Sequence, residues 1–109
     1  MKEIRKYVLD NGIIPFDEWF NSLDKTIKAK VLVRLERLKI GLLGDYRNLK
    51  NGVTELKFKS GERIYIYSEQ NSILILLITA GNKQRQNKDI EKAYEYLENY
   101  KKGLNNEEN

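Results

Sequence analysis

The chain has 109 residues, enough for one domain with a modest hydrophobic core and too few for two domains. Cysteine and histidine are both absent, which excludes disulfides, thiolate chemistry, Cys/His zinc sites and imidazole acid–base catalysis. No apolar segment is long enough to span a membrane, and the first residues are too polar for a signal peptide, so we expect a soluble cytoplasmic protein.

Positive charge is concentrated in the middle of the chain. The formal net charge is +4. Residues 24–40 carry six basic and two acidic side chains, residues 41–88 carry eight and four, and residues 89–109 carry three and six. This distribution suits an anionic partner such as nucleic acid. An ordinary solvated surface explains the charge alone equally well.

The first half of the chain predicts one strand followed by two helices. Residues 3–9 read as the strand, Pro15 suits the first position of a helix, and Asp24 suits the N-cap of a second, longer helix. Gly41 and Gly44 follow as signals that end this second helix. Apolar residues recur at helical spacing in both segments: Phe16, Trp19, Phe20 and Leu23 in the first, and Ile27, Val31, Leu35, Leu38 and Leu42 in the second. We expect these stripes to form core and the helices to pack as a hairpin.

The second half changes to the two-residue period of strands. Residues 53–59 and 63–67 alternate, with Ser60-Gly61-Glu62 between them as a hairpin turn, and residues 73–78 form the continuous apolar run of a strand covered on both faces. A last helix follows, with apolar residues at helical spacing: Ile90, Ala93, Tyr94 and Leu97. The predicted fold is α+β in the order β-α-α-β-β-β-α, a mainly antiparallel sheet packed on a helical hairpin. It forms a single domain of residues 1–103, with residues 104–109 as a flexible tail.

Alternation assigns the hairpin side chains to two faces. Four of them would face the helices, because burying each contributes ~1.5–3 kcal/mol: Leu56, Phe58, Ile64 and Ile66. The opposite face would carry polar and aromatic side chains: Glu55, Lys57, Lys59, Arg63, Tyr65 and Tyr67.

A three-residue loop keeps these two faces separate. In the expected register it pairs Lys59 with Arg63, Lys57 with Tyr65, and Glu55 with Tyr67. Two cations directly opposite each other cost ~0.2–1 kcal/mol. A face that carries two such cations can be explained in two ways. Either it binds an anion, or the two side chains point into solvent and neighbouring acidic residues neutralise them.

Several motifs in this half belong together. The most specific are Gly52-Val53-x-Glu55-Leu56, the strand Arg63-x-Tyr65, and Lys83 with Gln86 ahead of Asp89-Ile90-x-x-Ala93. With the aromatic first helix and the Gly41-x-x-Gly44-Asp45 segment, they resemble the RelE/ParE superfamily, most of all the HigB-like, phage-derived addiction-module killer proteins. The resemblance covers nearly all of the chain except the tail, and it implies a RelE-like fold.

The resemblance also implies a function. Such proteins cleave mRNA, typically in the ribosomal A site, and are neutralised by an antitoxin. The chain would then be the toxin of a type II toxin–antitoxin system: a metal-independent endoribonuclease without a cofactor that inhibits translation. Its partners would be mRNA, the ribosome and a helix-turn-helix antitoxin.

Two departures and two alternatives accompany this interpretation. Glu62 stands where the family usually has a tyrosine, and Asn82 stands where it usually has an aspartate. Both bear on proton transfer and on whether the chain is still toxic. Some relatives poison DNA gyrase instead of cleaving RNA, and a phage-derived interaction module without toxicity is the other alternative.

Cleavage of this kind needs cations and proton-transfer groups. The ribose 2′-OH attacks the adjacent phosphate, and cations stabilise the charge that develops. We expect Arg63 and Lys83 to hold the phosphate, Arg63 above all because a guanidinium contacts phosphate through two donors. Proton transfer falls to Tyr65, Lys57 or Glu55, and Tyr65 is preferred because a neighbouring Lys57 would favour its phenolate. The expected catalytic residues are Arg63, Lys83, Tyr65 and Lys57, and the expected RNA-binding residues are Lys59, Arg47, Arg85, Tyr67 and Lys50, with no metal site.

Overall fold

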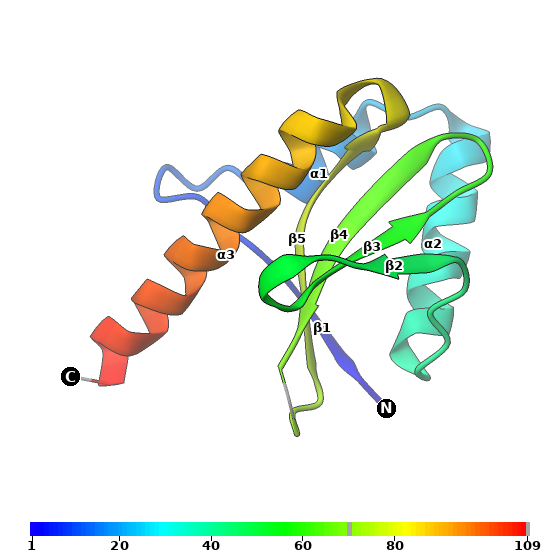
Figure 1. The fold of residues 1–109 in the computed structure, drawn as a ribbon. Coiled ribbons are helices and arrows are strands. Elements are labelled where there is room, and N and C mark those ends of the chain that lie inside the picture. The colour runs from blue at the N-terminus through cyan, green and yellow to red at the C-terminus, as the bar shows by residue number, and fades with distance from the viewer. Residues whose placement is uncertain (70, 109) are drawn as a thin grey trace.

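The computed structural model describes residues 1–69 and 71–108, except for the side chains of residues 105–108. In chain order the helices and strands are β1 (Glu3–Lys6), α1 (Pro15–Asn21), α2 (Lys25–Lys39), β2 (Tyr46–Asn48), β3 (Val53–Lys57), β4 (Glu62–Ser68), β5 (Leu74–Asn82) and α3 (Gln86–Glu108). Short 3₁₀ turns precede β3, at Lys50–Gly52, and α3, at Lys83–Arg85. The fold is therefore α+β, with three helices and a five-stranded sheet (Figure 1).

The two ends of the chain refine the predicted boundaries. The first strand is shorter than expected, because β1 ends at Lys6. The segment 104–109, expected to be a flexible tail, continues α3 as far as Glu108, and Asn109 lies outside the described residues. No helix in the described ranges is long and apolar enough to cross a membrane.

The sheet is mixed, in the order β1-β5-β4-β3-β2. Its first and last strands along the chain, β1 and β5, pair in parallel, and the other neighbours pair antiparallel, as predicted for most of the sheet. The predicted order omitted β2, a strand at the edge of the sheet. Its three residues are all exposed, so they carry no alternation of polarity from which a strand could be predicted.

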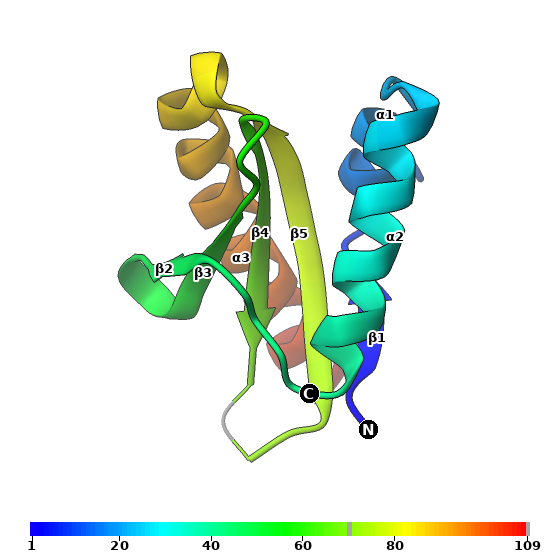
Figure 2. The same cartoon turned by 90° about the vertical axis from the view of Figure 1, so that its right-hand side faces the viewer.

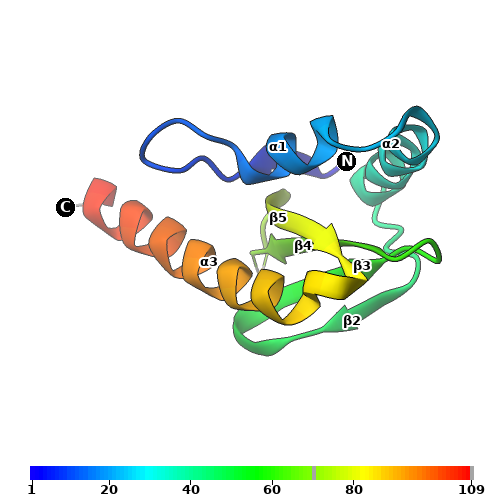
Figure 3. The same cartoon turned by 90° about the horizontal axis from the view of Figure 1, so that it is seen from above.

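Helices cover both faces of the sheet. Figures 2 and 3 show α1 and α2 on one face and α3 crossing the other. The expected sheet packed on a helical hairpin is therefore incomplete as a description, because the hairpin covers one face only. The apolar run at 73–78 had indicated a strand covered on both faces, and β5 is buried along most of its length.

Each face has its own hydrophobic cluster. The cluster under α1 and α2 contains Phe16, Val31, Leu38, Leu56, Ile64, Ile66, Ile75, Leu77 and Ala80. The cluster under α3 contains Tyr7, Val53, Tyr65, Leu76, Ile78, Ala93 and Leu97. The predicted apolar face of the hairpin is thus confirmed, with Phe58 partly buried at its margin.

The predicted ends of α1 and α2 are largely confirmed. Pro15 is the first residue of α1, and the Oδ1 atom of Asp24 accepts a hydrogen bond of 2.9 Å from the N–H of Ile27 at the start of α2. The predicted core position of Leu42 is wrong, since this side chain is 54% exposed. The helix ends at Lys39, before Leu42 could join its buried stripe.

Candidate functional site

The β3–β4 hairpin pairs Lys57 with Arg63 and Glu55 with Tyr65. These side chains share one face, as predicted, but the predicted register is wrong by two residues. The Phe58 N–H donates to the Glu62 carbonyl at 3.1 Å, which makes residues 59–61 the three-residue loop. Lys57, rather than Lys59, therefore lies opposite Arg63.

Glu55 is the centre of a buried polar cluster on this face. Its side chain is 0% exposed, and its Oε2 atom accepts hydrogen bonds from the Tyr65 hydroxyl at 3.0 Å and from Gln86 Nε2 at 2.9 Å. Its Oε1 atom lies 3.1 Å from a guanidinium nitrogen of Arg47, a charge contact without the alignment of a hydrogen bond. The cluster therefore joins β2, β3, β4 and the first turn of α3.

Tyr65 does not have the environment of a proton acceptor. It is fully buried under α3 and donates its hydroxyl hydrogen to Glu55. Burial first, and then the hydrogen bond and charge of Glu55, raise the pKa of Tyr65 well above its ordinary value. The expectation that Lys57 would favour the phenolate is therefore wrong, since Lys57 is paired with Arg63 and Tyr65 with Glu55.

This environment predicts a pH dependence. The raised pKa means that the neutral Tyr65 phenol stabilises the fold fully below pH ~10, and that this contribution is lost as the pH rises above that value. In alkaline titrations of unfolding free energy, the difference between wild type and Tyr65→Phe should shrink above pH ~10. A difference that grows there, or an absorbance titration in which Tyr65 ionises at its ordinary pKa, would contradict the buried environment.

Three of the predicted cationic residues gather at one end of the sheet. Arg63 lies between Lys57 on β3 and Gly81 on β5, and β5 leads directly into Lys83. A Cβ atom at Gly61, in the hairpin loop, would lie 3.9 Å from the Lys83 Cβ, so the loop and the turn before α3 are adjacent. Within the described residues, no carboxylate forms an ion pair with Lys57, Arg63 or Lys83.

The Arg63 guanidinium is held in place and still has free donors. One terminal nitrogen donates to the Glu62 carbonyl at 3.1 Å and to the Phe58 carbonyl at 3.4 Å. Its Nε atom is buried, and no hydrogen-bond acceptor is found for it in the described part of the chain. A guanidinium has five N–H donors, so the backbone positions the side chain while the two N–H groups of the other terminal nitrogen remain for an anion.

The other predicted RNA-binding residues lie in three places. Lys59 in the hairpin loop and Arg85 in the turn before α3 are exposed at the same end as Arg63. Arg47 forms an ion pair with Glu55, and its side chain is 48% exposed.

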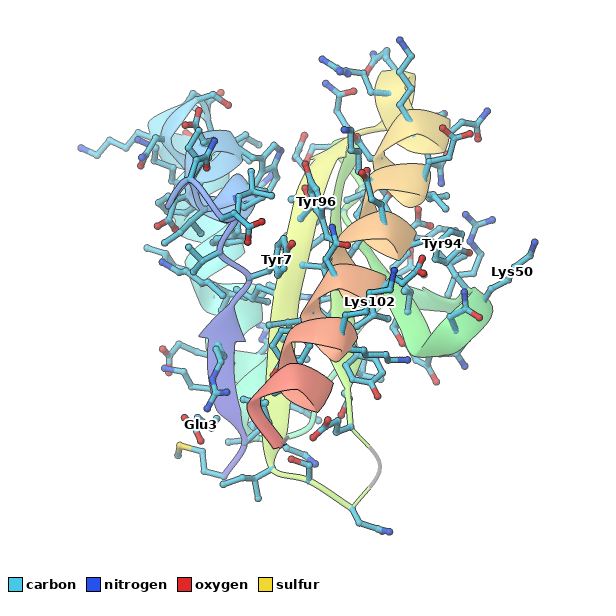
Figure 4. All side chains as sticks on the ribbon, turned by 90° about the vertical axis from the view of Figure 1, so that its left-hand side faces the viewer. Glu3, Tyr7, Lys50, Tyr94, Tyr96 and Lys102 are labelled. Carbon is cyan, nitrogen blue, oxygen red and sulfur yellow. The ribbon has the colours of Figure 1, made fainter. Side chains whose placement is uncertain are left out.

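Lys50 and Tyr67 belong to the other end of the hairpin. Tyr67 pairs with Val53, packs against Gly52, and lies with its ring centroid 4.8 Å from Lys101 Nζ. The Lys50 N–H donates to the Tyr94 hydroxyl at 3.2 Å, and the side chain extends into solvent (Figure 4). The structure therefore separates these two residues from Arg63.

From the sequence, Glu55 was one of three candidates for proton transfer, and its position at the centre of a buried cluster was not predicted. The motif Gly52-Val53-x-Glu55-Leu56 and the position of Gln86 drew attention to both residues. The sequence does not specify the position of α3, which places Gln86 within hydrogen-bond distance of Glu55 and completes the cluster.

Comparison with known proteins gives one relative and no functional assignment. The chain matches no protein-family model. An uncharacterized protein of Haemophilus influenzae is 35% identical to it over 82 residues, which are 73% of this chain and 83% of the relative.

Proposed function

We propose that this chain, which belongs to the same family as the uncharacterized Haemophilus influenzae protein, is a RelE-like toxin of a type II toxin–antitoxin system. It acts in the cytoplasm as a metal-independent endoribonuclease on mRNA, with the ribosome as the place of cleavage. The observation that carries the proposal is the cluster of Lys57, Arg63 and Lys83 at the end of the sheet.

This cluster has the properties that RNA cleavage requires. In the reaction the 2′-oxygen gives up its proton to a water molecule and attacks phosphorus, the bond to the 5′-oxygen breaks, and that oxygen takes a proton, which leaves a 2′,3′-cyclic phosphate. Negative charge develops on the phosphoryl oxygens, and preorganised cations stabilise it. Arg63, fixed by two backbone carbonyls, provides such a cation, and Lys57 and Lys83 flank it.

Proton transfer is assigned differently from the expectation. Tyr65 and Glu55 are buried and bonded to each other, so neither is free to exchange a proton with RNA. Of the three candidates, Lys57 is the one that is not fully buried and lies directly opposite Arg63. We assign it to proton donation to the leaving 5′-oxygen.

A second surface supports an antitoxin as partner. The outer side of α2 and the segment after it expose large apolar side chains: Leu32, Val33, Ile40 and Leu42. Beside them is a hollow of about 800 Å³ between α2 and the edge of the sheet, lined in part by Arg37, Lys57 and Lys59. Exposed apolar groups beside a hollow with several cations suit an acidic, amphipathic segment of a partner protein. The helix-turn-helix character of that partner rests on the family resemblance.

The proposal is tested by replacing Arg63 with alanine. With inducible expression and with purified ribosomes, Arg63→Ala should lower mRNA cleavage by roughly 10²-fold and relieve growth arrest, because it removes the central cation. Lys25→Ala is the matched control, since it removes an exposed cation at the start of α2 and should leave cleavage unchanged.

The same experiment distinguishes the alternatives. Undiminished cleavage by Arg63→Ala would refute the role of this cluster. Chromosomal DNA breaks without mRNA cleavage after induction would identify a gyrase poison. Wild-type expression that is harmless in the absence of any antitoxin would identify an interaction module.

A further inference from the structure

The turn before α3 carries Lys83 and is not held by packing of its own. Its three residues, Lys83–Arg85, are all exposed, and within the described part of the chain no ion pair involves them. Figure 2 shows the turn at the end of the sheet beside the β3–β4 loop, which leads into Arg63. Two cations on adjacent segments repel each other, so the turn stays beside the hairpin only if other contacts hold it there.

One set of contacts fastens the turn to the end of β5. The Oδ1 atom of Asn82 accepts a hydrogen bond of 3.2 Å from the Arg85 N–H, and the Asn82 N–H donates to the Asp89 carboxyl group. That carboxyl group is packed on Gly81, where a Cβ atom would lie 1.8 Å from Oδ2. These contacts join the turn and the start of α3 to β5, but none of them reaches β3 or β4.

Gln86 provides the contact with the β3–β4 hairpin. It is the first residue of α3 and directly follows Arg85. Its Nε2 atom donates to the Oε2 atom of Glu55 at 2.9 Å. This acceptor is fully buried on β3, and the Tyr65 hydroxyl on β4 donates to the same oxygen at 3.0 Å. The Gln86 amide is therefore bonded to a fixed point of the hairpin.

A glutamine at this position suits the charges around it. Its amide donates to a carboxylate without bringing a charge of its own. A glutamate there would place a second carboxylate against Glu55, and a lysine would add a further cation beside Lys83. Gln86 therefore holds the turn toward the hairpin and leaves the charge of the cluster unchanged.

We propose that Gln86 is a positioning residue, which holds Lys83 beside Arg63 so that both cations can bind the same phosphate. It acts through the turn and does not contact RNA, because its amide is directed to the buried Glu55. A misplacement of ~1 Å can lower the rate of a reaction by about 10²-fold, so the position of the turn matters. The proposal rests on the proposed ribonuclease function and adds to it the residue that keeps the two cations together.

Gln86→Met tests this role, because methionine keeps the length of the side chain and removes its donors. On purified ribosomes the variant should cleave mRNA roughly 10- to 100-fold more slowly than wild type. Gln84→Met is the matched control, since Gln84 is exposed in the same turn, and its cleavage should be unchanged. Wild-type cleavage by Gln86→Met, or an equal loss in both variants, would overturn the proposal.

A double-mutant cycle separates the positioning of Lys83 from a general effect on the fold. In single-turnover measurements, Gln86→Met should cause its full loss when Lys83 is present and a change of less than about twofold in a Lys83→Ala background. The same loss in both backgrounds would show that Gln86 acts through the fold as a whole, and the positioning role would be wrong.

Hydrogen exchange tests the link between Gln86 and the turn without RNA. The Arg85 and Gln86 N–H groups donate to the Asn82 Oδ1 atom and to the Lys83 carbonyl. In Gln86→Met they should exchange faster by roughly fivefold or more, while exchange in the middle of β5 stays as in wild type. Unchanged exchange at these two amides would contradict the link. If they respond as expected but the wild-type chain cleaves no RNA, the ribonuclease is refuted and the role of Gln86 in holding the turn remains.

Discussion

Glu55→Ala should destabilise the protein by roughly 3–5 kcal/mol, because it leaves buried polar partners without their acceptor. The Tyr65 hydroxyl and the Gln86 amide both donate to the Glu55 carboxylate, and the Arg47 guanidinium lies 3.1 Å from it. All three would lose their partner in a region that α3 covers. Urea unfolding followed by circular dichroism measures the loss.

Glu55→Gln is the matched variant for this prediction. A glutamine carbonyl oxygen can still accept from Tyr65 or Gln86, while the charge opposite Arg47 is removed. Its loss of unfolding free energy should be well below that of Glu55→Ala. Equal losses in the two variants would mean that the charge, rather than the hydrogen bonds, holds the cluster, and a loss of under ~1 kcal/mol in Glu55→Ala would contradict both accounts.

The second large effect is expected at Arg34, which fastens α2 to the edge of the sheet. Its three guanidinium nitrogens donate to the carbonyls of Leu43 at 3.0 Å, Lys57 at 2.9 Å and Asp45 at 2.6 Å. The guanidinium also lies over the Phe58 ring, 4.8 Å from its centroid. Hydrogen bonds from a charged donor contribute ~1.5–3 kcal/mol each, but this site is partly open and water can replace some of them. Arg34→Ala should therefore cost roughly 3 kcal/mol of unfolding free energy.

Arg37, one turn further along α2, provides the control for Arg34. It is exposed, so Arg37→Ala should change the unfolding free energy by no more than ~0.5 kcal/mol. Hydrogen exchange adds a local measurement, because loss of Arg34 should expose the amides of β2 more than those of β5. Similar unfolding free energies for the two variants would show that Arg34 does not fasten the edge.

The faces of the hairpin were predictable from its sequence, but its register was not. Strict alternation separates Leu56 and Ile64 from Lys57 and Arg63 in either register. A shift of two residues preserves this separation, so polarity cannot distinguish the alternatives. The observed loop has Gly61 as its last residue with φ of +108°, a conformation that favours glycine. The preference for glycine at a loop position with positive φ was the sequence signal from which the register could have been predicted.

The candidate site was predicted only in part, because the sequence does not specify where α3 packs. Arg63, Lys83 and Lys57 follow from strand alternation and from the motif before α3, and the structure brings them together. Tyr65 was preferred for proton transfer because a neighbouring Lys57 would favour its phenolate. The amphipathic pattern of α3 predicts a helix with one buried side but does not specify which face of the sheet it covers. Because α3 covers the face that carries Tyr65 and Glu55, both side chains are buried.

The parallel pairing of β1 with β5 has a consequence for the order of assembly during synthesis. The partners Ile4 and Ile75 are separated by most of the chain, so the first strand made has no neighbour until the last strand has been translated. Lys83 follows that last strand and completes the cation cluster. A partly synthesised chain therefore has neither a closed sheet nor a complete site. We expect the sheet to close only after residues 74–82 have left the ribosome.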